Sequence, residues 1–206
     1  MNIKTIFVIG DSISLHYGPY LEEMIKGKYS YRRKIKREDA LIDLDKPVGA
    51  NSGDSGMVLE YLRNEYDKGI HYDILMLNCG LHDIRVDKDT KKIQVEDLQY
   101  RENIDKIMQI ALKMSDDIFW ITTTPVNDKI HNRRKEGFLR YNKDVILYNN
   151  FANDIMNKYK IACIDLYTFT KSLGEDIYFD HVHFTEEIRA MQGAFITGYL
   201  FSKDQD

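Results

Sequence analysis

A serine, a histidine and an aspartate in this chain have the types and the spacing that nucleophilic catalysis requires. Ser12 follows Gly10-Asp11 at the end of a short apolar run. A serine hydroxyl is a poor nucleophile until a base removes its proton, and a histidine can do so when an acid fixes its tautomer. Asp180 and His183 are three residues apart, which on a turn puts both side chains on the same side. The sequence therefore predicts Ser12 as the nucleophile, His183 as the general base and Asp180 as the group that orients His183.

A second set of residues could stabilise the oxyanion of a tetrahedral intermediate, which needs backbone N–H groups and side-chain donors. Gly53 lies in the turn sequence Ser52-Gly53-Asp54-Ser55, and a glycine lets a backbone N–H approach a ligand closely. His82 lies in Gly80-Leu81-His82-Asp83 and could supply an imidazole N–H. The predicted oxyanion hole consists of the backbone N–H groups of Ser12 and Gly53 together with the His82 side chain.

Three further residues are candidates for contact with the substrate: Asp11, Asp83 and Arg133. Asp11 directly precedes the candidate nucleophile. Asp83 follows His82 and could instead cap a turn or brace the site. Arg133 belongs to a polar loop over residues 126–137 that could overhang the same edge, although a plain solvated loop is the simpler interpretation.

The other histidines raise the question of a metal. His181 and His183 form a His-x-His motif, which can bind a metal ion. No third ligand stands at a telling spacing, so we expect neither a metal nor a cofactor. His16, His71 and His131 are expected at the surface or at helix ends.

Apolar runs that end at turn residues alternate with amphipathic segments along the whole chain. The runs over 6–9, 73–79, 117–124 and 161–165 have the composition of buried parallel strands, and a short strand is expected at 47–48. Segments with helical periodicity lie between them. This pattern predicts an α/β fold: one three-layer α/β/α domain over residues 1–206, with a flavodoxin-like parallel sheet of about five strands. In such a sheet the residues that follow each strand meet at one edge.

Two segments lack a strand pattern. Residues 84–97 are charged and are expected to form an exposed loop. A basic cluster is expected to be a solvated loop or helix face rather than a nucleic-acid or membrane patch, in keeping with the net charge of −4. Its members are Lys26, Lys28, Arg32, Arg33, Lys34, Lys36 and Arg37.

Together, these motifs resemble those of the SGNH (GDSL-type) hydrolases, a superfamily of esterases and lipases. Gly10-Asp11-Ser12 matches the nucleophile block, Ser52-Gly53-Asp54-Ser55 the oxyanion-hole glycine block, and Asp180-His181-Val182-His183 the Asp-x-x-His block. The resemblance covers essentially the whole chain. In the third block, Gly80-Leu81-His82-Asp83, a histidine stands where the family has the asparagine of Gly-x-Asn-Asp. The resemblance implies the SGNH-hydrolase fold and a serine esterase.

The substrate is expected to be a small-molecule ester, with a short acyl group such as acetyl on a carbohydrate or another polar alcohol. The chain has no long apolar lid segment suited to a lipid. Three alternatives stay open: an inactive binding domain, for which the His82 replacement is the best support, an acyltransferase, and a lysophospholipase-type lipid esterase. Neither nucleic acid nor membrane is an expected partner, and the sequence leaves the oligomeric state open.

Location and redox state follow from simple features of the chain. The sequence contains no signal peptide, no transit peptide and no apolar run of membrane-spanning length, so a cytoplasmic location is expected. Cys79 and Cys163 both lie in apolar runs, which favours reduced thiols over a disulfide.

Overall fold

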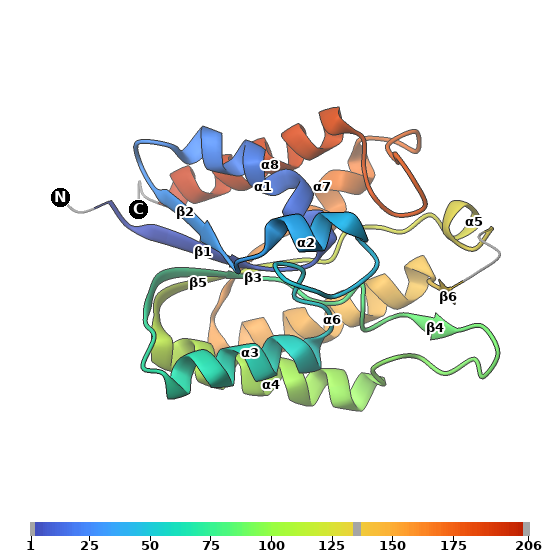
Figure 1. The fold of residues 1–206 in the computed structure, drawn as a ribbon, viewed down its shortest axis with the longest axis horizontal. Helices are drawn as coiled ribbons and strands as arrows, with labels where there is room; N and C mark the ends of the chain where they lie inside the picture. Colours follow the sequence, from blue (N-terminus) through green and yellow to red (C-terminus); the bar gives the residue numbers. More distant parts are fainter. Residues whose placement is uncertain (1–2, 134–136, 204–206) are drawn as a thin grey trace.

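The computed structural model describes residues 3–133 and 137–203. Its centre is a five-stranded sheet with the order β2-β1-β3-β5-β7, in which all neighbouring strands are parallel (Figure 1). The strands are β1 (Thr5–Ile9), β2 (Ser30–Arg33), β3 (Tyr72–Leu77), β5 (Ser115–Ile121) and β7 (Ala162–Ile164). This flavodoxin-like order confirms the prediction of a three-layer α/β/α fold.

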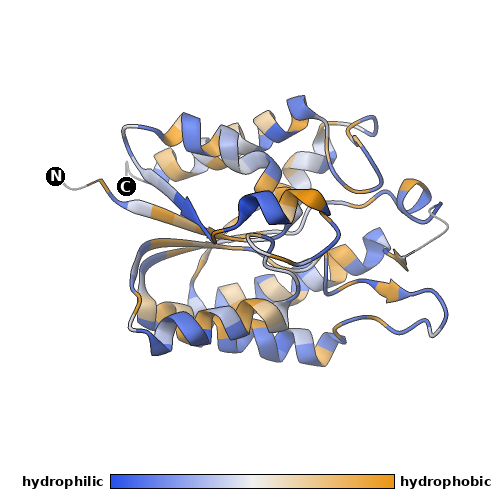
Figure 2. Cartoon of the chain, viewed as in Figure 1, coloured by the Kyte–Doolittle hydropathy of each residue, from blue (hydrophilic) through white to orange (hydrophobic). Residues whose placement is uncertain are grey.

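The helices form one layer on each face of the sheet. In Figure 1, three of them lie above it, α1 (Ser12–Ile25), α7 (Leu166–Ser172) and α8 (Glu186–Lys203). On the other face lie α3 (Ser55–Asp67), α4 (Asp97–Met114) and α6 (Asn142–Tyr159). Each of these helices buries one apolar face against the sheet. In α4 the residues of that face recur at helical spacing: Tyr100, Ile104, Ile107, Met108 and Ala111. Figure 2 shows the result, with apolar residues gathered in the strands and polar residues on the outer helix faces.

Helices α1 and α8 pack closely, although they come from opposite ends of the chain. A Cβ at Gly193 would lie 3.0 Å from both the Leu21 nitrogen and the Tyr20 Cβ, so the absence of a side chain permits this approach. The α1–α8 contact places the start of α8, and the loop before it, beside the start of α1.

The sequence predicts the second strand at residues 47–48, and this prediction is wrong, because residues 47–48 do not belong to any strand. The strand is β2, in the basic cluster that was expected to be a solvated loop or helix face. As an edge strand it buries only Tyr31, so it lacks the apolar pattern of a central strand. The Arg33 guanidinium donates to Ser14 and to the Ala50 carbonyl, so part of the cluster is structural.

Two short strands form a ribbon outside the main sheet. Strands β4 (Val86–Asp87) and β6 (Phe138–Leu139) pair antiparallel, so residues 84–97 are not only an exposed loop. Two short helices, α2 (Arg37–Ile42) and α5 (Asp128–His131), lie near the carboxyl ends of the strands. Within the described ranges, no helix combines the length and apolarity that a membrane crossing needs. Cys79 is buried, Cys163 is half-buried, and both are free thiols.

Candidate active site

Ser12 is the first residue of α1, directly after the carboxyl end of β1. The turn is tight, because a Cβ at Gly10 would lie 2.9 Å from both Cβ and Oγ of Ser14. Asp11 is the N-cap residue of α1, and its Oδ1 accepts from the Ile13 N–H at 2.9 Å. The strand-to-helix turn therefore fixes the backbone around the serine.

The structure brings Ser12, His183 and Asp180 together. His183 Nε2 lies 2.8 Å from Ser12 Oγ, and His183 Nδ1 lies 2.7 Å from Asp180 Oδ2. An ionised carboxylate only accepts, so the His183 proton sits on Nδ1 and Nε2 accepts from the serine hydroxyl. The other carboxylate oxygen accepts from the backbone N–H groups of Val182 and His183. Burial alone would raise the pKa of Asp180, but its hydrogen bond to His183 and these N–H groups hold the pKa well below its usual value.

The candidate oxyanion donors lie on two loops at the same edge. The Ser52 N–H donates to the Gly10 carbonyl at 3.0 Å, which ties the loop of Gly53 to the serine turn. Gly53 has φ +72°, and a Cβ there would lie 2.5 Å from Sδ of Met57. Its N–H has a long hydrogen bond, 3.2 Å, to Asn51 Oδ1. The backbone of Gly53 thus has a left-handed conformation, and its surroundings leave no space for a side chain.

His82 is almost fully buried, and its Nδ1 has no hydrogen-bond partner among the described residues. Burial, followed by the charges of Arg85 and Arg140, lowers the pKa of His82 well below its usual value. The imidazole is therefore neutral at neutral pH and carries one N–H. A neutral imidazole can donate one hydrogen bond, as an amide does.

The three residues suggested for substrate contact have other surroundings. Asp11 and Asp83 are buried at 2% and 0% exposure, and each accepts a backbone N–H hydrogen bond within the protein, so their contact with a substrate stays a prediction. Asp83 braces α3, because its Oδ1 accepts from the Ser55 N–H at 2.9 Å, and burial raises its pKa to about 7. Burial also raises the pKa of Asp11. Arg133 is exposed just after α5, and its role stays a prediction.

Several residues beside the site were missed or misplaced by the sequence analysis. His131 is the last residue of α5, which agrees with the prediction of a helix end, but its side chain is fully buried. His16 is half-buried inside α1 and packs edge-to-face on His183, with ring centroids 5.1 Å apart. Burial lowers the pKa of His16 to about 3. Arg140, at 2% exposure, was not singled out at all. His16 is four residues after Ser12, one turn along α1, and that spacing was the one available signal.

The clustered ligand atoms of Asp180, His181 and His183 lie within 4.8 Å of one another. In the structure these atoms are used in hydrogen bonds. Asp180 and His183 bind each other, and both ring nitrogens of His181 have protein partners, Asp45 and His131. The cluster is accounted for by these contacts.

Comparison with known proteins places this geometry in a known fold. No protein-family model and no curated protein matches the chain. Among solved structures, the chain is similar to a lipase/acylhydrolase from Enterococcus faecalis, with a TM-score of 0.69 and 15% identity over 98% of this chain and 97% of that one. It is also similar to a GDSL-like lipase from Bacteroides thetaiotaomicron (TM-score 0.68, 15% identity, 97% and 89% covered). A third is Axe2, an acetylxylan esterase from Geobacillus stearothermophilus (TM-score 0.65, 13% identity, 94% and 92% covered). The chain has the fold of the SGNH hydrolases, as its motifs predict.

Proposed function

We propose that the protein is a serine ester hydrolase that works through an acyl-enzyme. The observation that carries the proposal is the 2.8 Å contact between Ser12 Oγ and His183 Nε2, with Asp180 behind the histidine. A serine, a histidine and an acid hydrogen-bonded in this order form the arrangement that activates a serine hydroxyl. The fold supports the same conclusion, since the similar structures include proteins named as esterases and acylhydrolases.

The proposed reaction proceeds in two halves. Ser12 Oγ attacks the ester carbonyl while His183 Nε2 takes the hydroxyl proton, and the ionised Asp180 stabilises the imidazolium. His183 then gives the proton to the leaving alcohol, and the acyl group stays on Ser12. Water attacks the acyl-enzyme with His183 again as base, and the acid is released.

The negative oxygen of each tetrahedral intermediate needs donors that are already in place. The N–H groups of Ser12 and Gly53 and the His82 side chain are the proposed donors, and the Gly53 N–H exchanges its long hydrogen bond to Asn51 Oδ1 for the oxyanion. The neutral state of His82 suits the role of a donor, because burial first, and then the charges of Arg85 and Arg140, disfavour a second proton on the ring.

The proposed substrate carries a short acyl group, such as acetyl, on a carbohydrate or another polar alcohol. The similarity to an acetylxylan esterase supports this choice. One observation bears on the alternative of a longer acyl chain: Phe179, next to Asp180 in the sequence, is 72% exposed.

The test uses p-nitrophenyl acetate and p-nitrophenyl octanoate with the wild-type protein, Ser12→Ala and Ser172→Ala. Ser12→Ala should reduce kcat by ~10⁴-fold or more and should not react with a fluorophosphonate probe. Ser172→Ala, at an exposed serine at the end of α7, should behave as wild type. Full activity in Ser12→Ala would overturn the proposed mechanism, and a preference for octanoate would overturn the short-acyl substrate.

A further inference from the structure

A second Asp–His pair lies beside the catalytic one. His181 Nε2 is 3.3 Å from Asp45 Oδ2, and its Nδ1 is 3.2 Å from Nδ1 of His131. The other nitrogen of His131, Nε2, is 3.3 Å from Nη1 of Arg140, and both of these residues are buried. The four residues Asp45, His181, His131 and Arg140 are named here the histidine bridge.

Arg140 sets the direction of the hydrogen bonds in the bridge. A guanidinium only donates, so His131 Nε2 accepts. A neutral His131 then carries its proton on Nδ1 and donates to His181 Nδ1. His181 in turn carries its proton on Nε2 and donates to the Asp45 carboxylate. One arrangement of protons therefore satisfies the whole bridge, from a cation at one end to an anion at the other.

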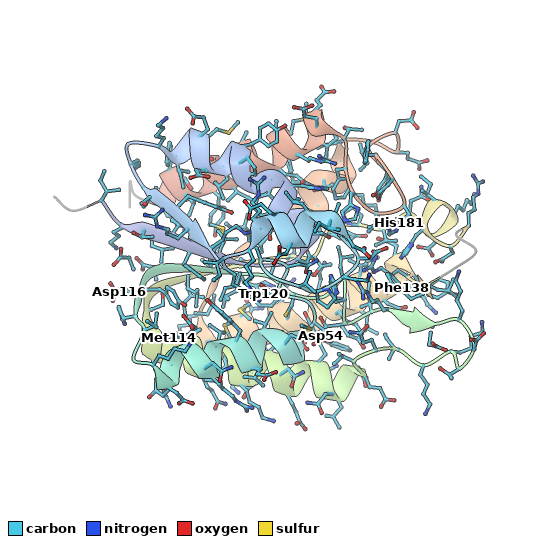
Figure 3. The ribbon with its side chains drawn as sticks, in the orientation of Figure 1. Asp54, Met114, Asp116, Trp120, Phe138 and His181 are labelled. Atoms are coloured by element: carbon cyan, nitrogen blue, oxygen red, sulfur yellow. The ribbon has the colours of Figure 1, made fainter. Side chains whose placement is uncertain are left out.

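The Arg140 end of the bridge is attached to the loop of His82. Arg140 Nε donates to the carbonyl oxygen of Leu81 at 2.6 Å, one residue before His82. The guanidinium also lies over the Phe138 ring, 4.6 Å from its centroid, which holds it beside β6. Figure 3 shows Phe138 and His181 at the same end of the molecule.

The Asp45 end is attached to the loop that leads to Gly53. The carbonyl of Asp45 accepts from the Arg85 guanidinium, and the backbone N–H of Arg85 donates to the His82 carbonyl at 3.3 Å. The Asp45 end of the bridge is therefore also connected to the His82 loop, through Arg85. It joins the loop of Gly53, the loop of His82 and the loop that carries the catalytic pair.

The middle of the bridge packs against the catalytic histidine. The rings of His181 and His183 meet edge-to-face, with centroids 5.7 Å apart and planes at 78°. This is a favourable arrangement of two aromatic rings. Both ring nitrogens of His181 have protein partners, so His181 affects the reaction through its neighbours in the bridge and through the His183 ring.

We propose that His181 is a positioning residue, which holds His183 and Asp180 in register with Gly53 and His82 through the histidine bridge. The inference rests on the proposed function, since register matters only if the loops act on one substrate. Small displacements of reacting groups have large kinetic effects, because a misplacement of about 1 Å can lower a rate by ~10²-fold.

The first test is His181→Phe, which keeps a ring against His183 but makes neither hydrogen bond of the bridge. We expect kcat to fall ~10-fold or more, with KM within about threefold of wild type. The matched control is His71→Phe, the same change in the exposed His71–Asp116 pair, and Figure 3 shows Asp116 at the opposite end of the molecule. A kcat of His181→Phe within twofold of wild type would overturn the proposal.

The second test separates positioning from packing. In His131→Asn the amide nitrogen can still donate to His181 Nδ1, whereas His131→Leu fills the space without a donor. Positioning through the bridge requires a higher kcat in His131→Asn than in His131→Leu. The reverse order would show that His131 matters only for its volume. If His181→Phe does not fold, Asp45→Ala cuts the bridge at a partly exposed side chain, and the same kinetic criterion applies to it.

A third readout does not depend on ester hydrolysis. The His183 Nδ1–H lies in a short charge-assisted hydrogen bond, which gives a low-field proton NMR signal. In His181→Phe this proton should exchange with water at least severalfold faster than in wild type, and in His71→Phe at the wild-type rate. An unchanged exchange rate would overturn the inference. If the wild-type protein hydrolysed no ester, the proposed function would fail while this comparison still decided the role of His181.

Discussion

Two Asp–His pairs of nearly equal length lie at opposite ends of the sheet. His183 Nδ1 is 2.7 Å from Asp180 Oδ2 where the strands end, and His71 Nε2 is 2.8 Å from Asp116 Oδ1 where β3 and β5 begin. The side chains of His183 and Asp180 are 2% and 33% exposed, whereas those of His71 and Asp116 are 56% and 59% exposed. The contact distance alone does not distinguish them.

The difference lies in burial and in a third partner. In water, an exposed ion pair contributes little, since the solvent screens the charges and both side chains lose freedom. Around His183, burial weakens the screening, and Ser12 occupies the second ring nitrogen. The same two side-chain types therefore form a surface contact in one place and a serine-activating pair in the other.

The largest effect is expected when the histidine of each pair is replaced by alanine, first His183 and then His71. His183→Ala should lower kcat by ~10⁴-fold or more, because the serine loses its base. His71→Ala should leave kcat within about twofold, because an exposed pair contributes little. Steady-state kinetics on one ester under identical conditions measures both. Comparable losses in the two variants would show that the buried pair has no special role.

A smaller effect is expected when His82, the proposed side-chain donor to the oxyanion, is replaced. His82→Ala should lower kcat ~10²–10³-fold, the usual cost of one oxyanion donor. His82→Asn should recover part of that loss, because its amide nitrogen can donate in place of the imidazole. The measurement is kcat of the three proteins with KM determined in parallel. If His82→Ala kept the wild-type kcat, the intermediate would have to be stabilised without His82.

The smallest expected effect is on the pH dependence of stability, and it compares the buried carboxylate of Asp83 with the exposed carboxylate of Asp117. Burial raises the pKa of Asp83 from 3.8 to about 7, so the folded protein binds this proton more tightly than the unfolded chain. Stability from this group is therefore present at low pH and is lost as the pH rises from about 4 to about 7. Asp83→Asn stays neutral and keeps an oxygen for the Ser55 N–H.

The melting temperature of Asp83→Asn relative to wild type should therefore be higher at pH 8 than at pH 5. The expected change is about 2–4 °C for each kcal/mol of charge burial that the substitution removes. Asp117→Asn, at an exposed carboxylate paired with Lys4, serves as the control and should show the same difference at both pH values. A difference for Asp83→Asn that did not change with pH would mean that this carboxylate ionises in the folded protein without penalty.

The convergence of Ser12, Asp180 and His183 was accessible from the sequence. Parallel strands end at one edge, and Asp-x-x-His places its two side chains together by local geometry. The nearness of Gly53 follows from the same rule. These residues depend on short-range chain geometry and on the sheet, and both leave a pattern along the chain.

The surroundings of the site were not accessible in this way. Arg140, His131 and Asp45 come from polar segments, and their contacts join residues far apart in sequence. A polar loop residue has the same local pattern whether it is solvated or buried against a distant partner. Strand β2 was missed for a related reason, because an edge strand with one buried side chain shows no apolar run.

The contact between Ser12 and His183 joins residues 171 positions apart, across the packed helices α1 and α8. This has a consequence for protein synthesis, in which the N-terminal part of the chain emerges from the ribosome first. A nascent chain that has completed β1 to β7 already contains the serine, but it contains no base for it. The esterase proposed here therefore becomes active only when the last helix has emerged and docked, and hydrolysis during translation would report completion of the fold.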